Sequence, residues 1–261
     1  MGIEFPDEPA LIPYFTAGDP SLDSVPEIIE AFERGGADVI EVGLPFSEPI
    51  AEGPTIQNAI DRALKNGMTP DVFFEKVGEA DVNVPLAVMT YYNLIFKRGV
   101  ENFVKDCKRV GIEAVIVPDL PVDESDELYT ACRKHDLDYI YLVAPTTTDE
   151  RLERIMERAS GFVYVQARLG TTGARRNVSR TTHEVLKSLE GFDIPKAVGF
   201  GVSEREHARE IIEGGADGVI AGSVFVGLIA NNDDYIGKLE EKARELKQGA
   251  LSGRGAKQEQ R

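Results

Sequence analysis

Short apolar segments alternate with longer segments of helical apolar spacing along most of the chain. The short segments are rich in Val and Ile, which is typical of buried strands. They are Leu11–Phe15, Val39–Val42, Leu86–Met89, Ala114–Val117, Tyr139–Val143, Phe162–Val165, Lys196–Gly199 and Gly218–Ala221. The helical patterns between them include Val25–Arg34, Val100–Val110, Glu124–His135, Asp149–Ala159, Thr182–Leu189 and Glu204–Glu213. Strands that alternate with helices pair in parallel, and eight of them close a barrel. The pattern therefore predicts an α/β fold, a single-domain (β/α)8 TIM barrel.

Glycine pairs or single glycines mark the predicted joints between helix and strand. The segments that begin at Gly35, Gly111 and Gly214 each lead into an Ala/Val/Ile run within a few residues, as expected where glycine caps a helix in the left-handed conformation. The last residues, from Gly249 to Arg261, are rich in Gly, Gln and Arg and lack apolar periodicity. We therefore predict a barrel domain over residues 1–248 and a disordered tail over residues 249–261.

Length and charge narrow the class of protein. A chain of 261 residues suits one barrel, because such domains run to about 250 residues. The net charge of −16 argues against nucleic acid, whose phosphates require basic surface. Two cysteines are too few for a disulfide framework, no apolar run approaches bilayer length, and no signal-peptide pattern opens the chain. We expect a cytoplasmic protein without membrane contact.

One predicted strand carries a charge where another Val or Ile is expected. Glu41 interrupts the apolar run Ala37–Val42, and burying an unpaired carboxylate is costly. A Gly/Pro-rich loop follows with two more acids, Glu48 and Glu52, ahead of a helix for which Thr55 is a candidate cap. This order of strand, acid, acidic loop and helix is typical of a catalytic site, although loop acids are also common as solvated charge.

The segment Glu41–Asn58 closely resembles the signature of the tryptophan synthase alpha chain family. These are (β/α)8 lyases that split indole-3-glycerol phosphate into indole and glyceraldehyde 3-phosphate. Further segments resemble the family's landmarks in the same order along the chain. They are Pro13–Pro20, Met89–Asn93, Pro118–Ser125, Gly170–Gly173, Gly199–Ser203 and Ala221–Ser223.

The resemblance implies two catalytic carboxylates. Glu41 matches the general acid/base that protonates indole C3 and deprotonates the glycerol C3′ hydroxyl. Glu52 matches the residue that accepts the indole N–H as positive charge develops on the ring. The family usually has Asp at the positions of Glu48 and Glu52. The extra methylene adds roughly 1.5 Å of reach, which the loop must absorb.

The resemblance also places the rest of the substrate. The phosphate is expected at Gly173, Gly201, Gly222 and Ser223, where glycine lets backbone N–H groups approach an anion. Arg175 and Arg176 either attract the phosphate or simply lie on the same loop. The indole and glycerol pocket is expected to comprise Tyr14, Met89, Ile116, Leu142, Tyr164, Thr172 and Phe200. For most of the apolar members an ordinary core role is nearly as probable in a barrel interior.

A partner is implied as well. The family works as two alpha and two beta chains, and the beta chain holds pyridoxal phosphate and receives indole. Docking is expected at the barrel mouth through Glu48, Pro49, Asn93 and Pro121. We expect no cofactor and no metal in this chain, because its three histidines fall on predicted outer helices. The segment Met1–Pro9 is too short for the helix that normally plugs the family's barrel floor.

Two other functions remain open at this point. The chain could be mainly an allosteric binding module for the beta chain, since Glu52 departs from the usual residue. It could instead be another phosphate-handling barrel, such as a sugar-phosphate epimerase or isomerase. Such enzymes typically need a metal–histidine site or a Cys/Lys base, and the barrel-mouth segments offer neither.

Overall fold

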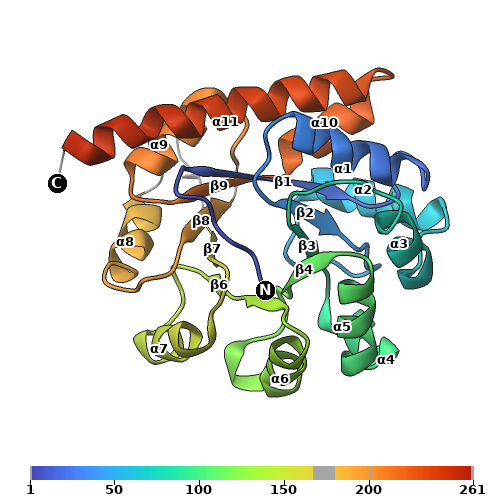
Figure 1. Ribbon diagram of the computed structural model, residues 1–261, viewed down its shortest axis with the longest axis horizontal. Coiled ribbons are helices and arrows are strands. Elements are labelled where there is room, and N and C mark those ends of the chain that lie inside the picture. The colour runs from blue at the N-terminus through green and yellow to red at the C-terminus, as the bar shows by residue number, and fades with distance from the viewer. Residues whose placement is uncertain (1, 167–179, 200, 260–261) are drawn as a thin grey trace.

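A ring of parallel strands with helices around it forms the chain, as the computed structural model shows for residues 2–166, 180–199 and 201–259 (Figure 1). The strands are β1 (Ala10–Thr16), β2 (Ile40–Gly43), β3 (Leu86–Met89), β4 (Ile112–Ile116), β5 (Asp138–Ile140), β6 (Leu142–Val143), β7 (Val163–Gln166), β8 (Lys196–Gly199) and β9 (Gly218–Ala221). They are hydrogen-bonded in the order β5-β4-β3-β2-β1-β9-β8-β7-β6. Only Tyr141 separates β5 from β6, so these two together occupy one barrel position. The predicted TIM barrel is confirmed.

Helices connect successive strands on the outside of the ring. They are α1 (Ser24–Arg34), α2 (Pro54–Lys65), α3 (Pro70–Val77), α4 (Tyr92–Arg98), α5 (Val100–Arg109), the 3₁₀ turn η1 (Val122–Glu124), α6 (Asp126–Lys134), α7 (Asp149–Arg158), α8 (Arg180–Ser188), α9 (Arg205–Glu213), α10 (Ser223–Asn231) and α11 (Tyr235–Glu259). Among the described residues, no helix is long and apolar enough to cross a membrane.

The short helices α3 and α4 were not among the predicted helical segments, because an apolar pattern is weak over two turns. α3 nevertheless has a sequence signal, because the Thr69 hydroxyl accepts a hydrogen bond from Val72 N and Pro70 occupies the first helical position. At α2 the predicted cap was two residues too late. Gly53, rather than Thr55, precedes the helix, and Pro54 begins it.

Strand residues alternate between an outer and an inner core. On β1, Leu11 and Phe15 pack outward against the helices, while Ile12 packs in the barrel interior. The interior cluster also contains Val39 and Ile116. Because side chains on a strand alternate between faces, Glu41 shares the inward face with Val39. Its register partner on β1 is Tyr14, so these two residues lie side by side at the mouth of the barrel.

The floor of the barrel is filled by the N-terminal segment in extended form, at the centre of the ring in Figure 1. Ile3 is buried in the interior cluster, and Phe5 lies against Phe162 with ring centroids 5.6 Å apart. Ile3 N donates a hydrogen bond to Asp138 Oδ2 at 2.6 Å. Two apolar side chains thus occupy the place for which the resemblance implies a helix.

The predicted tail is wrong over residues 249–259, because α11 continues to Glu259 and lies along α9 (Figure 1). Its glycines serve close packing rather than chain flexibility. A Cβ on Gly249 would lie 2.3 Å from Arg205 O, and one on Gly253 would lie 2.6 Å from Arg209 O. Spacing of four residues puts both glycines on one helix face, which lets α11 approach the backbone of α9.

Candidate active site

A cavity of about 310 Å³ lies at the carboxyl ends of the strands. It is lined by residues from β1, β2, β3, β6, β7, β8 and β9, from Gly201 after β8, from the start of α10, and from the loop and helix that follow β2. Its lining comprises Tyr14, Glu41, Ala51, Glu52, Gly53, Pro54, Thr55, Ile56, Met89, Leu142, Tyr164, Gln166, Gly199, Gly201, Ile220, Gly222 and Ser223. This is the end of a barrel at which active sites are found.

Glu41 is the most unusual group in the cavity. It is 1% exposed, and within the described part of the chain neither of its carboxylate oxygens has a hydrogen-bond partner. Burial, with a smaller contribution from the negative charge of Glu52, raises the pKa of Glu41 to about 8. The group is therefore a neutral acid at pH 7, although it remains close enough to its pKa to act as a base.

Glu52 lies in a different environment although it lines the same cavity. The Tyr91 hydroxyl donates a hydrogen bond to Glu52 Oε2 at 2.5 Å. Partial burial raises the pKa of Glu52, while the hydrogen bond from Tyr91 lowers it. The pKa of Glu52 is raised overall, as is that of Glu41, but only Glu52 has a hydrogen-bond donor that favours the ionised form. Two carboxyl groups in such different surroundings can take separate roles in proton transfer on a substrate that gains positive charge.

The helix behind this loop is held against the barrel by charge. Arg62 of α2 forms two hydrogen bonds of 2.8 Å with the buried Asp19 carboxylate. Asn66, at the end of α2, donates to the carbonyl oxygens of Gly18 at 2.8 Å and Pro20 at 2.7 Å. These contacts join α2 to the loop after β1 and so hold in place the helix that follows the loop carrying Glu52.

A second part of the cavity suits an anion. Gly222 precedes α10, whose first residue is Ser223, and both line the cavity together with Gly201. A helix N-terminus has N–H groups without intrahelical acceptors and carries partial positive charge. Gly201 has a φ of +78°, which favours glycine, and a Cβ on Gly222 would lie 3.2 Å from the Tyr14 ring. Backbone N–H groups are thus accessible here because side chains are missing.

The predicted apolar pocket is assembled in part. Tyr14, Met89, Leu142 and Tyr164 line the cavity. Ile116 does not, because it is fully buried in the interior cluster. Burial raises the pKa values of Tyr14 and Tyr164, so both phenols keep their protons. Thr172, Gly173, Arg175, Arg176 and Phe200 lie outside the described residues.

The four residues predicted to face a partner lie on the loops and helix start at the same end of the barrel. Glu48, Asn93 and Pro121 are exposed, and Pro49 is partly exposed. Two apolar side chains accompany them, since Ile50 is 79% exposed and Phe96 is 65% exposed. The rim therefore offers apolar surface next to polar and charged groups.

Tyr91 and Gln166 are among the residues of the site that were not predicted. Tyr91 belongs to a segment that the resemblance covers, but nothing in its local pattern points to a contact with Glu52, 39 positions earlier. Gln166 lines the cavity at the end of β7. Its alternation with Tyr164 on the same strand was the available signal, because residues two apart share a face.

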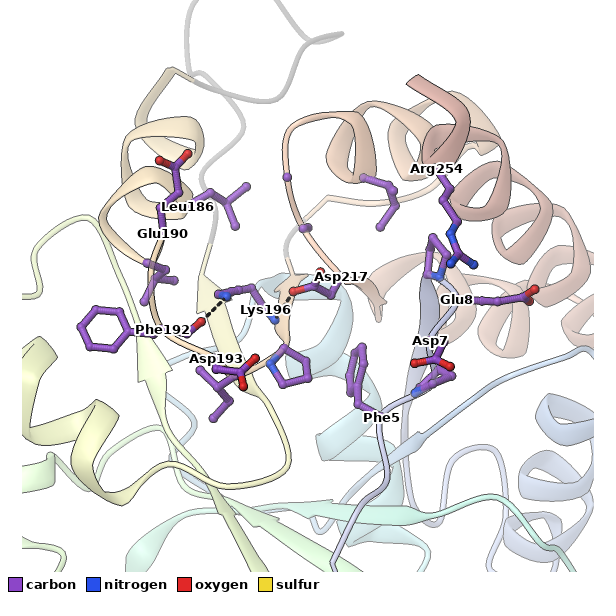
Figure 2. A pocket seen from close by; sticks show the side chains of 18 of the residues that line it. Phe5, Asp7, Glu8, Leu186, Glu190, Phe192, Asp193, Lys196, Asp217 and Arg254 are labelled. Atoms are coloured by element: carbon purple, nitrogen blue, oxygen red, sulfur yellow. Dashed lines mark hydrogen bonds between the residues drawn. The ribbon is translucent and has the colours of Figure 1, made fainter. Parts of the chain in front are cut away.

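A larger hollow of about 760 Å³ lies at the opposite end, between the N-terminal segment, the loop before β8 and the loop before β9. Figure 2 shows Lys196 and Asp217 within it, and both groups hold the fold together. Lys196 Nζ donates to Phe192 O at 2.7 Å, and Lys196 N donates to Asp217 Oδ2 at 3.0 Å. The described residues contain no group of three or more His, Cys, Asp or Glu side chains placed to hold a metal.

Comparison with known proteins gives one answer. The family model for the tryptophan synthase alpha chain matches residues 3–253. The tryptophan synthase alpha chain of Haloferax volcanii is 56% identical over 260 residues, covering 95% of this chain and 94% of that protein. That of Halobacterium salinarum is 53% identical over 264 residues, covering 97% and 96%.

Solved structures agree with this comparison. A structure of the tryptophan synthase α2β2 complex from Pyrococcus furiosus, described for its mutual activation, contains a chain with 40% identity and a TM-score of 0.86. The match covers 91% of this chain and 97% of that one. Tryptophan synthase from M. tuberculosis in an open form with BRD0059 bound has 35% identity and a TM-score of 0.84, with 94% of each chain covered.

Proposed function

The chain belongs to the tryptophan synthase alpha chain family, and we propose that its barrel-mouth cavity performs the alpha reaction with Glu41 as the group that moves protons. The reaction cleaves indole-3-glycerol phosphate into indole and glyceraldehyde 3-phosphate. The observation that carries the assignment of roles is the Glu41 carboxyl group, buried in the cavity without a hydrogen-bond partner among the described residues. A carboxyl group in that environment is available for chemistry because no structural contact uses it.

The proton steps balance around this one group. Neutral Glu41 gives its proton to C3 of the indole ring, which leaves positive charge on the ring nitrogen. The Glu41 carboxylate then takes the proton of the C3′ hydroxyl while the bond between C3 and C3′ breaks. The electron pair of that bond returns to the ring, the alcohol carbon becomes the aldehyde, and Glu41 ends protonated again. A pKa of about 8 permits both transfers near neutral pH.

Glu52 is proposed as the acceptor for the indole N–H. Positive charge on the ring nitrogen appears only as C3 is protonated, so a carboxylate at that position stabilises the transition state more than the ground state. Glu52 lines the same cavity as Glu41, and its charge contributes to the raised pKa values of Glu41 and Tyr14. The apolar walls contributed by Met89 and Leu142 suit the ring between them.

The phosphate is proposed to bind at the start of α10. Replacing Gly222 with Asp is expected to raise KM for indole-3-glycerol phosphate by roughly tenfold or more, because like charges about 4 Å apart repel strongly near a protein surface. The exposed Gly237→Asp, on α11, is the matched control for an added carboxylate, since a Cβ there meets nothing within 4 Å. Steady-state kinetics with both variants would measure the effect. Saturation of Gly222→Asp at the wild-type concentration would place the phosphate elsewhere.

The proposal includes a beta-chain partner. The Pyrococcus furiosus structure is of an α2β2 complex, and we propose the same assembly here, with docking on the rim that carries Glu48, Pro49, Asn93 and Pro121. The exposed Ile50 and Phe96 support this choice of surface, because exposed apolar groups on a polar rim often mark interaction sites. Pyridoxal phosphate is proposed to belong to the partner, and the complex to work in the cytoplasm.

An assay of indole release tests this function against the binding-module alternative. The isolated chain is expected to release indole from indole-3-glycerol phosphate slowly but measurably, and a beta chain is expected to raise the rate. If the substrate is not cleaved either by the chain alone or by the complex, the chain is a binding module and the proposed function is wrong.

A further inference from the structure

One tyrosine outside the predicted set holds the loop that carries Glu52. Tyr91 directly precedes α4, two residues after the end of β3, and it is 3% exposed. Its hydroxyl donates to Glu52 Oε2 at 2.5 Å and accepts hydrogen bonds from Ile50 N at 2.7 Å and Ala51 N at 2.8 Å. A phenol has one proton to donate and two lone pairs, so all of its hydrogen-bonding capacity is spent on this loop.

The ring of Tyr91 contacts the same loop nearer to β2. It stacks on Phe46 with ring centroids 5.2 Å apart and an interplanar angle of 29°. The segment from Phe46 to Glu52 is therefore attached to one side chain at two places, through the ring at one and through the hydroxyl at the other. Glu52 has a long side chain with three rotatable bonds, and the phenol limits where its carboxylate can point.

The electrostatic surroundings explain why a donor is useful here. The titratable groups that affect Glu52, or are affected by it, are Tyr14 of β1, Glu41 of β2, Tyr91 before α4, Asp119 after β4 and Tyr164 of β7. None of these five side chains is a cation, and burial raises the pKa of Glu52. The hydrogen bond from Tyr91 opposes that rise. Burial raises the pKa of Tyr91 itself, so the phenol remains a donor at any pH in the working range.

From these contacts we infer that Tyr91 is a positioning residue, which aims the Glu52 carboxylate into the cavity and donates a hydrogen bond that favours its ionised form for the indole N–H. This inference rests on the proposed role of Glu52. It also accounts for glutamate at this position, because the longer side chain reaches a phenol that lies on the neighbouring strand's loop. Tyr91 itself touches neither of the reacting carbons in this account and acts through Glu52 alone.

The first test is Tyr91→Phe in the full chain, which keeps the ring on Phe46 and removes the hydroxyl. The kcat for indole release is expected to fall about ten- to a hundredfold, the range for loss of a hydrogen bond to a charged group, while KM stays within about threefold. The acid limb of the kcat–pH profile is expected to move to higher pH, because Glu52 loses the donor that favours its ionised form. Tyr139→Phe is the matched control, since that buried phenol bonds Leu120 O away from the cavity.

A double-mutant cycle with Glu52→Gln separates positioning from general loop stability. If Tyr91 acts through Glu52, then Tyr91→Phe lowers kcat little or not at all in the Glu52→Gln background. An equal loss in both backgrounds, or an acid limb that does not move, would overturn the inference while leaving the role of Glu52 in place. If Glu52→Gln itself leaves kcat unchanged, the proposed role of Glu52 fails and the inference fails with it.

A second variant tests the inference even if Tyr91→Phe fails to fold. Glu52→Asp with Tyr91 intact withdraws the carboxylate from the phenol by about one methylene, and it is expected to shift the acid limb in the same direction as Tyr91→Phe. Far-ultraviolet circular dichroism and thermal melts on each variant show which rates come from folded protein. A Glu52→Asp profile identical to wild type would contradict the inference independently of Tyr91→Phe.

Discussion

Glu41→Gln abolishes cleavage of indole-3-glycerol phosphate while leaving substrate binding nearly intact, if the proposed role of this residue is right. The amide keeps the shape of the carboxyl group but cannot give and take a proton. Loss of a general acid/base typically costs about 10²- to 10⁴-fold in rate, and here one group serves both transfers. Measured kcat is therefore expected to fall by at least that factor, with a calorimetric dissociation constant for substrate within a few-fold of wild type.

Unfolding would not explain such a loss. An acid whose pKa is raised in the folded state destabilises the protein as pH rises above the unfolded value of about 4.5, and the pKa of Glu41 is about 8 in the fold. The amide carries no such penalty, so its melting temperature at pH 8 is expected to equal or exceed that of wild type. Glu113→Gln, a strand acid near the floor end of β4, is the matched control. Turnover by Glu41→Gln within a few-fold of wild type would refute the assignment.

Substitution of Glu52 is expected to have the second large effect on kcat. Glu52→Gln is expected to lower kcat by about 10²-fold or more with a small change in substrate binding, because charge is lost where positive charge develops. Glu52→Asp is the sharper variant. It retains the charge but misplaces the carboxylate by about 1 Å and is expected to cost roughly tenfold, since Tyr91 holds the longer side chain in place.

Steady-state kinetics of three Glu52 variants, Gln, Asp and Ala, would show whether the carboxylate and its side-chain length matter for catalysis. An Asp variant that equals or exceeds wild type would mean that the loop is indifferent to side-chain length. An Ala variant with unchanged kcat would mean that Glu52 is only solvated charge and that Glu41 works without it.

The barrel was predictable because its signal is repeated. Each buried strand, such as Leu86–Met89 or Lys196–Gly199, is a short apolar run bounded by glycine, proline or polar residues, and the same joint recurs along the chain. Glu41 was conspicuous for the same reason, since a charge stands out within an apolar run. Local pattern therefore located the strand, its inward face and the acid that interrupts it.

The sequence was a poor guide to features that depend on contacts between distant elements. Gly249 and Gly253 were interpreted as chain flexibility, but they pack α11 closely against α9. Tyr91 was overlooked because its contacts lie about forty positions away in the sequence, and no local period encodes them. Ile116 was expected in the substrate pocket, and its position on β4 buries it in the interior cluster rather than in the cavity lining. Such features depend on how the elements pack, which a single local pattern does not specify.

The pH dependence of kcat/KM for indole release by the isolated chain tests the central claim most directly. This ratio reports groups of the free enzyme, and neutral Glu41 is the form that protonates C3. At constant ionic strength we predict a basic limb with an apparent pKa of about 8, which matches that of the buried carboxyl group. On this limb activity falls tenfold per pH unit as the pH rises. A rate that stays constant to pH 10, or rises through pH 8, would contradict the account.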